Sequence, residues 1–384
     1  MNEMHFKGKI NRRSFLRAGM VGACTLGLAG FHSLTSSSVS SAARKGFINP
    51  VRSKWFTGND QNQLSCLLCP KACTLDVGER APCGVRENRN GKGYTLAYGN
   101  PALIQEDPVE RKPFFHVLPG KRALSISTAG CNLECDFCEV WDMALVKPEE
   151  VYAYDLPPER VIAHAKEADV KAISYAFGEP VIFYEYMQDI SRLAREANLL
   201  NLMHTAGYIQ PDPLNEIIDQ LDAVNIDLKS FEPEFYRQVV GGELEPVLKT
   251  LQRIKEAGVH IEITSIIIPT LNDDQEMIRE MCQWIVDELG EGVPIHFARF
   301  YPLYRLSSLP RTPVFTLEQA RNTALKAGLQ FVYLSRVTGH EAENTFCPGC
   351  QKVVIDRKGF IIDELNLSQG KCKFCGTEIP GRWT

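Results

Sequence analysis

The sequence predicts an α/β fold, a partial (β/α)6 barrel of the TIM type with a small cysteine-rich module before it and a zinc-ribbon-like tail after it. The first observation is that strand-like and helix-like stretches alternate through the middle of the chain. Alternation at this spacing is typical of right-handed parallel βαβ units. The second is that most of the 13 cysteines fall into three tight groups, one in each predicted region. In a long chain with a core, such grouping favours metal ligation over a disulfide framework.

Residues 1–45 have the features of an export signal. Arg12 and Arg13 precede Ser-Phe-Leu, which resembles a twin-arginine motif, and a weakly apolar run follows. This run is too short and glycine-rich to span a membrane stably, and Ser-Ala-Ala at 41–43 resembles a cleavage site. We therefore expect twin-arginine export, to a periplasmic or membrane-associated location. Two alternatives remain: a lipoprotein box ending at Cys24, or a basic tail on a cytoplasmic protein.

The remaining chain divides into three predicted regions. Residues 46–117 form a cysteine-rich N-terminal module that ends in a loop at 105–108, residues 118–337 form the core, and residues 338–384 form the tail. Too few βα units are present for a closed eight-stranded barrel, so an open partial barrel is expected, with its chemistry at the C-terminal ends of the strands. The predicted strands are 123–128, 172–177, 200–205, 223–228, 260–268, 295–300 and 330–334. The predicted helices are 157–168, 184–197, 213–221, 244–257, 275–289 and 317–327.

A cysteine motif directly follows the first predicted core strand. Cys131, Cys135 and Cys138 have the spacing C-x3-C-x2-C. Three thiolates in one loop can each bind one iron of a [4Fe–4S] cluster and leave the fourth iron open for the amino and carboxylate groups of S-adenosylmethionine. Phe137 is expected to lie against the cluster and the adenine. A three-cysteine zinc knuckle is the alternative, but structural zinc takes four ligands and no histidine is near.

Several further motifs make a family resemblance specific. They lie at 66–73, 84–88, 177–180, 222–229, 296–302 and 343–348. Together with the cluster motif they resemble the radical S-adenosylmethionine (radical SAM) superfamily and its pyruvate formate-lyase activating-enzyme branch. The chain is most similar to the radical SAM enzymes of the AmmeMemoRadiSam system, over nearly all of residues 60–384. The resemblance implies that a 5′-deoxyadenosyl radical abstracts hydrogen from a partner protein or a small molecule. It also implies a low-potential electron donor of the flavodoxin or ferredoxin type, and partners from the AmmeMemoRadiSam system.

The resemblance also indicates residues that contact S-adenosylmethionine. Gly178, Glu179 and Pro180 resemble a GGEP-type motif in which Phe177 replaces the first glycine. Glycine beside a strand end lets the backbone approach a ligand. Glu179 is expected to accept from the methionine ammonium group, and a plain strand-to-helix turn is the alternative.

Two further strand ends carry candidate contacts. Asp227 and Lys229 share one face of a strand, since side chains alternate. The resemblance implies that Lys229 pairs with the methionine carboxylate; a surface ion pair is the alternative. His296 is a candidate ribose contact or a hydrogen-bonding core residue. His204 stands where relatives often carry an aspartate, which puts in doubt a cation site built from that aspartate.

Two four-cysteine groups flank the core. Cys347-x2-Cys350 and Cys372-x2-Cys375 enclose a predicted hairpin, the arrangement of a zinc ribbon or rubredoxin. Four thiolates accept zinc or one iron, and two disulfides are the alternative.

The N-terminal group has a different spacing. Cys66, Cys69, Cys73 and Cys83 predict a possible second site, either zinc or an auxiliary cluster. Cys282, within a helical pattern, is expected to pack in the core.

The net charge and composition of the chain limit the classes of function that we expect. A net charge of −5 gives no reason to expect binding to nucleic acid or a membrane surface. A nucleic-acid-modifying enzyme guided by the ribbon would show basic and aromatic surface signals, which the tail lacks. An electron carrier with several iron–sulfur centres is the main rival to the radical enzyme. The three-cysteine ligation favours the enzyme, because a carrier would saturate its cluster.

Overall fold

The computed structural model describes residues 42–384, which form one compact unit. Arg12, Arg13 and Cys24 lie outside the described residues, so export stays a prediction. In the described part of the chain, no helix has both the length and the apolar character that crossing a membrane requires.

The central sheet of the described residues has eight strands in the order β16-β15-β14-β13-β12-β11-β9-β8. The pairs from β9 to β16 are all parallel, and β8 is antiparallel to β9. In this register Tyr175 of β11 pairs with Ile126 and Met203, so the C-terminal ends of neighbouring strands lie at one edge. The strands are β8 (Leu103–Pro108), β9 (Arg122–Ser127), β11 (Ala172–Tyr175), β12 (Leu200–Thr205), β13 (Ala223–Asp227), β14 (His260–Ile267), β15 (Ile295–Arg299) and β16 (Val332–Ser335).

The parallel α/β core is confirmed, but the prediction of a loop at 105–108 is wrong. This segment belongs to β8, which pairs with β9 along its whole length. Because β8 is an edge strand, it tolerates polar side chains and a terminal proline that would disfavour a central strand. The strands follow the sequential order of a barrel, with β8 and β16 as the two edges. The partial barrel with six units stays a prediction.

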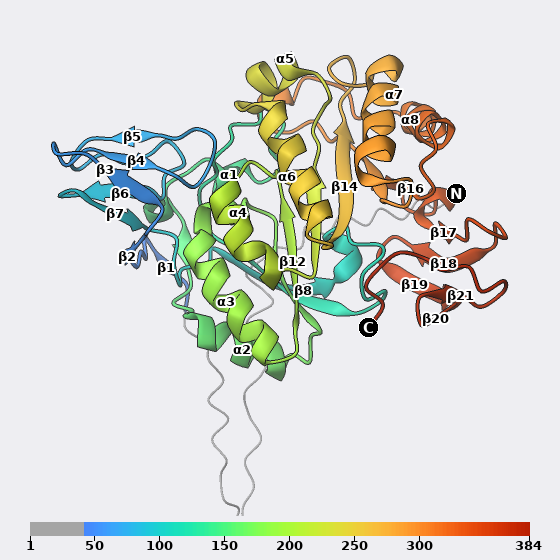
Figure 1. Ribbon diagram of the computed structural model, residues 1–384, viewed down its shortest axis with the longest axis horizontal. Coiled ribbons are helices and arrows are strands. Elements are labelled where there is room, and N and C mark those ends of the chain that lie inside the picture. The colour runs from blue at the N-terminus through green and yellow to red at the C-terminus, as the bar shows by residue number, and fades with distance from the viewer. Residues whose placement is uncertain (1–41) are drawn as a thin grey trace, which may run out of the picture. The chain divides into compact units, whose positions relative to one another are not determined.

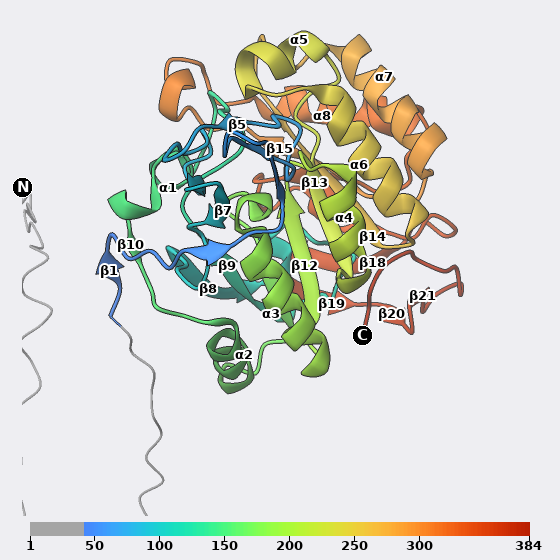
Figure 2. The same cartoon turned by 60° about the vertical axis from the view of Figure 1, so that its left-hand side comes forward.

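Helices connect successive parallel strands. Because neighbouring strands are joined by right-handed crossovers, the helices fall on one side of the sheet, and Figures 1 and 2 show them following one another around the strands. In α6, Val247, Leu251 and Ile254 are buried, and the helix ends before Gly258, whose φ is +72°. The helices are α1 (Trp141–Ala144), α2 (Pro158–Glu167), α3 (Tyr184–Glu196), α4 (Pro211–Ile217), α5 (Pro233–Phe235), α6 (Leu244–Glu256), α7 (Gln275–Trp284) and α8 (Val314–Lys326).

The N-terminal region adds small antiparallel sheets. One has the order β3-β4-β5 and a second β2-β7-β6, while β1 pairs with β10. The strands are β1 (Arg44–Lys45), β2 (Val51–Arg52), β3 (Phe56–Gly58), β4 (Leu64–Cys66), β5 (Thr74–Leu75), β6 (Arg86–Arg89), β7 (Lys92–Thr95) and β10 (Tyr152–Ala153). The buried Arg86 forms an ion pair with Glu185 of α3 and so joins this region to the core.

The C-terminal region contains the predicted hairpin. Strands β18 and β19 are antiparallel, and Gly359 turns between them with φ of +62°. The strands are β17 (Thr345–Phe346), β18 (Val353–Lys358), β19 (Ile361–Leu365), β20 (Leu367–Ser368) and β21 (Lys371–Cys372). This region packs on the β16 side of the core, while the N-terminal sheets lie at the other end of Figure 1. The domain boundaries at 117/118 and 337/338 stay predictions.

Candidate active site

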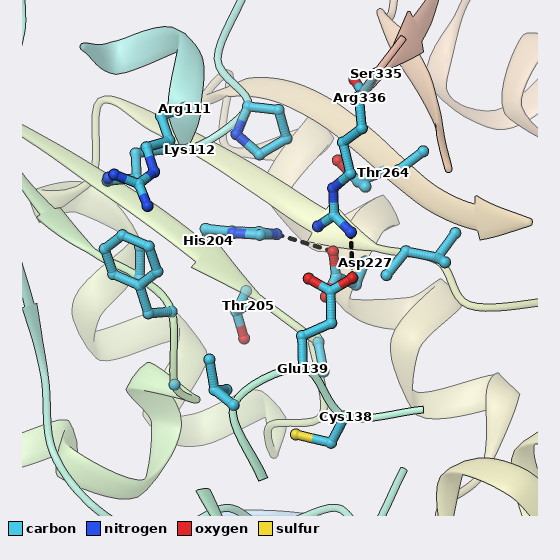
Figure 3. Close-up of a pocket in the computed structure, with 18 of the residues that line it drawn as sticks. Arg111, Lys112, Cys138, Glu139, His204, Thr205, Asp227, Thr264, Ser335 and Arg336 are labelled. Carbon is cyan, nitrogen blue, oxygen red and sulfur yellow. Dashed lines mark hydrogen bonds and ion pairs between the residues drawn. The ribbon is translucent and has the colours of Figure 1, made fainter. Parts of the chain in front are cut away.

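A cavity of about 500 Å³ lies at the C-terminal ends of the parallel strands. Figure 3 shows the side chains that line one part of it. The loop after β9 contributes Cys131, Cys135 and Cys138 to its wall. The ends of later strands and the turns that follow them contribute Phe177, Gly178, Glu179, His204, Thr205, Asp227, Lys229, Thr264, Ala298, Ser335 and Arg336. The structure therefore brings the three motif cysteines and most of the predicted contact residues into one cavity.

The cysteine loop is held by backbone hydrogen bonds. Glu134 N donates to Val240 O at 2.9 Å, and Asp136 N donates to Val239 O at 2.9 Å. Gly130 has φ of +105°, and a Cβ there would lie 2.7 Å from the carbonyl oxygen of Cys83. Glycine is therefore required at this point of the loop, both for its conformation and for its close contact.

The donor set of the loop fits a [4Fe–4S] cluster. All three cysteines line the same cavity, and Phe137 lies in its wall beside them. Burial raises the pKa of Cys135 to about 11, and the Lys229 ammonium acts in the opposite direction. Coordination by iron removes the thiol proton and so relieves this cost.

The turn after β11 accounts for the phenylalanine in the predicted motif. Phe177 has φ of +73°, a conformation that glycine adopts far more readily. Its ring lies 4.2 Å from the Nζ atom of Lys112, which compensates for part of this strain. Gly178 N donates to Ser127 Oγ at 3.0 Å, and a Cβ on Gly178 would lie only 2.4 Å from that oxygen.

Glu179 is a buried carboxylate held in one orientation. It accepts from Thr205 Oγ1 at 2.6 Å, from Ala206 N at 2.9 Å and from Val181 N at 3.1 Å. Burial raises its pKa, while these donors stabilise the charged form. Glu179 lines the cavity, as expected for a group that accepts from an ammonium ion. Pro180 is buried at the start of the short helix η3 (Pro180–Phe183) and is not among the lining residues.

Asp227 and Lys229 form an ion pair in the cavity wall rather than on the outer surface. Lys229 Nζ lies 3.1 Å from Asp227 Oδ2. Figure 3 shows the second contact of this carboxylate, in which His204 Nε2 donates to Asp227 Oδ1 at 2.8 Å. Burial alone would raise the pKa of Asp227, but the Lys229 ammonium and His204 outweigh it and hold the pKa below its usual range. Lys229 is therefore charged and oriented toward the cavity by Asp227.

The prediction that His296 contacts the ribose is not supported by the structure. His296 is fully buried and outside the set of lining residues. Its Nε2 donates to Glu262 Oε2 at 2.7 Å, and its ring stacks on Tyr333. The alternative that sequence analysis left open, a hydrogen-bonding core histidine, describes it better. Glu262 also accepts from the backbone N–H groups of Phe115 and His116, while the other ring nitrogen of His296 lies 3.5 Å from Ser335 Oγ.

Sequence analysis missed several charged residues of the cavity. Arg336 and Glu139 form an ion pair, drawn in Figure 3. Both positions carried a signal, because Glu139 follows the last motif cysteine and Arg336 follows the last parallel strand. Lys112 was also missed; burial lowers its pKa to about 8, although Asp107 of β8 pairs with it. Without β8 in the predicted sheet, nothing placed Asp107 or Lys112 near the cavity.

Exposed apolar side chains surround part of the cavity. Tyr301, Leu303 and Phe360 line it and are exposed by 36%, 41% and 47%. Phe360 comes from the turn between β18 and β19, so the C-terminal hairpin contributes to the active-site wall. Such exposure of large apolar groups beside a cavity is typical of a surface that binds another molecule.

The four C-terminal cysteines and Cys282 lie outside the cavity. Cys347, Cys350, Cys372 and Cys375 form a group that could hold a metal ion, with all four sulfur atoms within 4.8 Å of one another. Which metal they bind stays a prediction. Cys282 is fully buried in the core, as expected.

Comparison with known proteins agrees with this geometry. Residues 125–285 match the model of the radical SAM superfamily. An uncharacterized protein of Methanocaldococcus jannaschii is 40% identical over 322 residues, which cover 83% of this chain and 96% of the relative. The pyruvate formate-lyase-activating enzyme of Clostridium pasteurianum is 28% identical over 187 residues, 46% of this chain and 76% of the relative.

Among solved structures, a radical SAM methyltransferase from Sphaerobacter thermophilus covers 75% of this chain and 77% of its own, at 17% identity and a TM-score of 0.46. The family match spans the cysteine loop, the glutamate turn and the aspartate–lysine pair described above. The chain therefore belongs to the radical SAM superfamily.

Proposed function

We propose that this protein is an activating-enzyme-like radical SAM enzyme that abstracts hydrogen from a segment of a partner protein. The observation that carries the proposal is the single cavity that joins three cluster cysteines, a buried carboxylate and a buried ammonium group to a rim of exposed apolar side chains. When bound, the cluster supplies the electron that cleaves S-adenosylmethionine to a 5′-deoxyadenosyl radical. A small-molecule substrate in the same cavity remains the alternative within this chemistry.

The residues of the chain bind and orient the methionine part. Glu179 is fixed by three donors and presents negative charge to the methionine ammonium group. Lys229 is held by Asp227 and presents positive charge to the methionine carboxylate. Charge-assisted bonds of this kind are directional, so the two groups together define one orientation of the bound cofactor.

The exposed apolar side chains at the rim of the cavity favour a protein as the substrate. Tyr301, Leu303 and Phe360 provide apolar contact area. Trp141 and Tyr304, which directly follow the lining residues Val140 and Leu303, stack with ring centroids 5.4 Å apart. Aromatic residues are enriched where proteins meet. Relatives that act as pyruvate formate-lyase-activating enzymes support the same substrate class. We propose in addition a flavodoxin- or ferredoxin-type donor, a partner from the AmmeMemoRadiSam system, and twin-arginine export with the cofactor sites already filled.

The cofactor orientation is tested by Lys229→Ala. Loss of a charge-assisted hydrogen bond is worth roughly 1.5–3 kcal/mol, so affinity for S-adenosylmethionine should fall about ten- to a hundredfold. The iron content should stay unchanged, since Lys229 is not a cluster ligand. Lys171→Ala is the matched control, because Lys171 is exposed and pairs only with Asp169. Unchanged binding in Lys229→Ala would remove Lys229 from the cofactor site.

Analysis of the products formed from S-adenosylmethionine distinguishes a radical enzyme from the rival function, an electron carrier. The reduced enzyme should form 5′-deoxyadenosine and methionine from S-adenosylmethionine, and Cys135→Ala should abolish this. A protein that exchanges electrons but never cleaves S-adenosylmethionine would be the carrier. The substrate class is then tested by isolating bound partner proteins and searching them by mass spectrometry for loss of hydrogen or cleavage.

A further inference from the structure

A second, smaller cavity lies in the N-terminal region. Its lining includes all four cysteines of that region, Cys66, Cys69, Cys73 and Cys83, together with Arg86. Three of the cysteines lie on β4 and the loop that joins it to β5, and Cys83 lies in the turn before β6. Four thiols separated in sequence thus converge on one space that the active site does not use.

The spacing of these thiols differs from that of a single-ion site. Zinc bound by thiolates at about 2.3 Å requires sulfur atoms about 3.8 Å apart. The C-terminal group meets this condition, with 3.5 Å between Cys347 and Cys375 and 3.8 Å between Cys350 and Cys372. Among residues 42–384, that group alone has three or more ligand atoms mutually within 4.8 Å.

The N-terminal thiols instead resemble the cluster loop. Cys131, Cys135 and Cys138 also surround a cavity without forming a compact group. A [4Fe–4S] cube holds each cysteine at a separate iron, so its ligands form a wider tetrahedron than those of a single ion. The N-terminal thiols, like those of the cluster loop, therefore do not form the compact group that a single ion requires.

The two cavities share their structural elements. The carbonyl group of Cys83 packs against Gly130, next to Cys131. Asn132, which follows Cys131, lines the second cavity. Val181 and Ile182 line it as well, and they belong to the short helix that follows Glu179. The second cavity is thus directly behind the wall of the active site.

Arg86 supplies an independent indication of a ligand. Its side chain is 1% exposed, and its Nη atoms bond to Glu185 at 2.6 Å and 2.9 Å. Its Nε atom is buried without a partner in the described structure. A buried N–H group without a partner is costly, and sulfur atoms of a cluster are acceptors that would satisfy it. Metal-bound thiolates accept the same bond, so this N–H group indicates an occupied site, and the spacing of the thiols indicates a cluster.

The geometry points to a second [4Fe–4S] cluster bound by Cys66, Cys69, Cys73 and Cys83, adjacent to the cluster of the active site. Four cysteines saturate this second cluster, so it binds no S-adenosylmethionine. The first cluster, with three cysteines, keeps one iron open. The chain then holds two clusters of different ligation beside each other.

The test uses full-length protein reconstituted without oxygen and analysed for metal content, Mössbauer spectrum and electron paramagnetic resonance. The triple variant Cys131→Ala, Cys135→Ala, Cys138→Ala should keep about four irons per chain in [4Fe–4S] form. Its reduced signal should not respond to S-adenosylmethionine. The double variant Cys69→Ser, Cys73→Ser should lose about four irons relative to the wild type and keep the responsive signal. In the wild type, the two reduced clusters should broaden each other's signals.

Cys350→Ser with Cys372→Ser is the matched control, and it should cost at most one metal ion. Zinc in place of iron in the triple variant would overturn the proposal. Disulfides among the four cysteines, or a triple variant without iron, would do the same. If the N-terminal double variant does not fold, the triple variant decides alone, because its N-terminal ligands are intact. If the paramagnetic signal of the wild-type protein did not respond to S-adenosylmethionine, that result would count against the proposed function and not against the second cluster.

Discussion

The N-terminal and C-terminal regions each contain four cysteines, but they arrange them differently. The C-terminal thiols are in contact across a compact hairpin, whereas the N-terminal thiols surround a cavity next to the active site. The first arrangement suits one ion that closes a small fold, and the second suits a cluster placed beside another cluster. The number of cysteines therefore indicates a metal, while their spacing in the folded chain indicates which kind.

The largest difference should appear when one ligand is removed from each region. Cys347 is fully buried in the C-terminal region, so Cys347→Ser should release the metal and unfold the ribbon. Structural zinc contributes about 10 kcal/mol or more to such small folds. Limited proteolysis with mass spectrometry should show new cleavage after residue 338, with the iron content of the active site unchanged. Cys66→Ser should instead lose iron and leave the ribbon resistant. If Cys347→Ser and Cys66→Ser changed proteolysis and iron content alike, the two cysteine groups would not differ in the kind of metal site they form.

A smaller effect is expected where the ribbon joins the core. Arg357 is buried, and it donates to Phe115 O at 2.6 Å and Thr345 Oγ1 at 2.7 Å. Arg357→Met leaves these acceptors unsatisfied and should destabilise the docked ribbon by about 3 kcal/mol. Hydrogen exchange in β17 and β18 measures this. Lys358→Met is the control, since Lys358 is exposed. If both variants exchange alike, the ribbon does not depend on Arg357.

Much of the core could be predicted from sequence, because its signals are local. Strand–helix alternation gave the parallel strands, and the cysteine motif after β9 gave the cluster loop. The edge strand β8 was missed because its second half is polar and its pairing with β9 is a tertiary contact. The role of His296 stayed open in the sequence for a similar reason, since its partner Glu262 comes from a different strand. The ion pair of Arg336 and Glu139 joins residues nearly 200 positions apart, which no local pattern shows.

The junction should also respond to pH. Burial lowers the pKa of His116 from 6.5 to about 3, although Glu262 and the hydrogen bond to Pro380 O act in the opposite direction. The second ring nitrogen, Nε2, bonds to Tyr333 Oη at 2.6 Å. Between about pH 6.5 and pH 3, His116 is protonated in the unfolded state but neutral in the folded state. The free energy of unfolding therefore falls as the pH drops through this range. The slope is about 1.4 kcal/mol per pH unit for one proton. The protection factors of the tail, which correct for the pH dependence of intrinsic exchange, should therefore fall in acid.

His116→Gln is the test of this assignment. Glutamine does not titrate, so the variant should be less stable at neutral pH but should lose most of the slope between pH 6.5 and 5. The cysteine loop, which lies away from this junction, provides the internal reference. A slope that survives the substitution would assign the pH response to another group, such as Glu262.

The smallest predicted effect concerns the one place where the ribbon reaches the active site. Phe360 lies at the hairpin turn, lines the cavity and is 47% exposed, so a substrate segment can bury what remains of its ring. Phe360→Ala should raise the KM for the partner segment by about fivefold, since partial burial of an aromatic ring is worth about 1 kcal/mol. The rate of S-adenosylmethionine cleavage without a partner should stay the same.

Phe374 offers a matched control, because it belongs to the same ribbon and is 48% exposed but does not line the cavity. Phe374→Ala should leave the KM unchanged. If both variants raise it equally, the ribbon affects the substrate through its stability and not through contact. If only Phe360→Ala raises it, the two cysteine regions serve one site in different ways. The C-terminal region then acts through an apolar side chain that its metal holds in place, and the N-terminal region acts through the cluster itself.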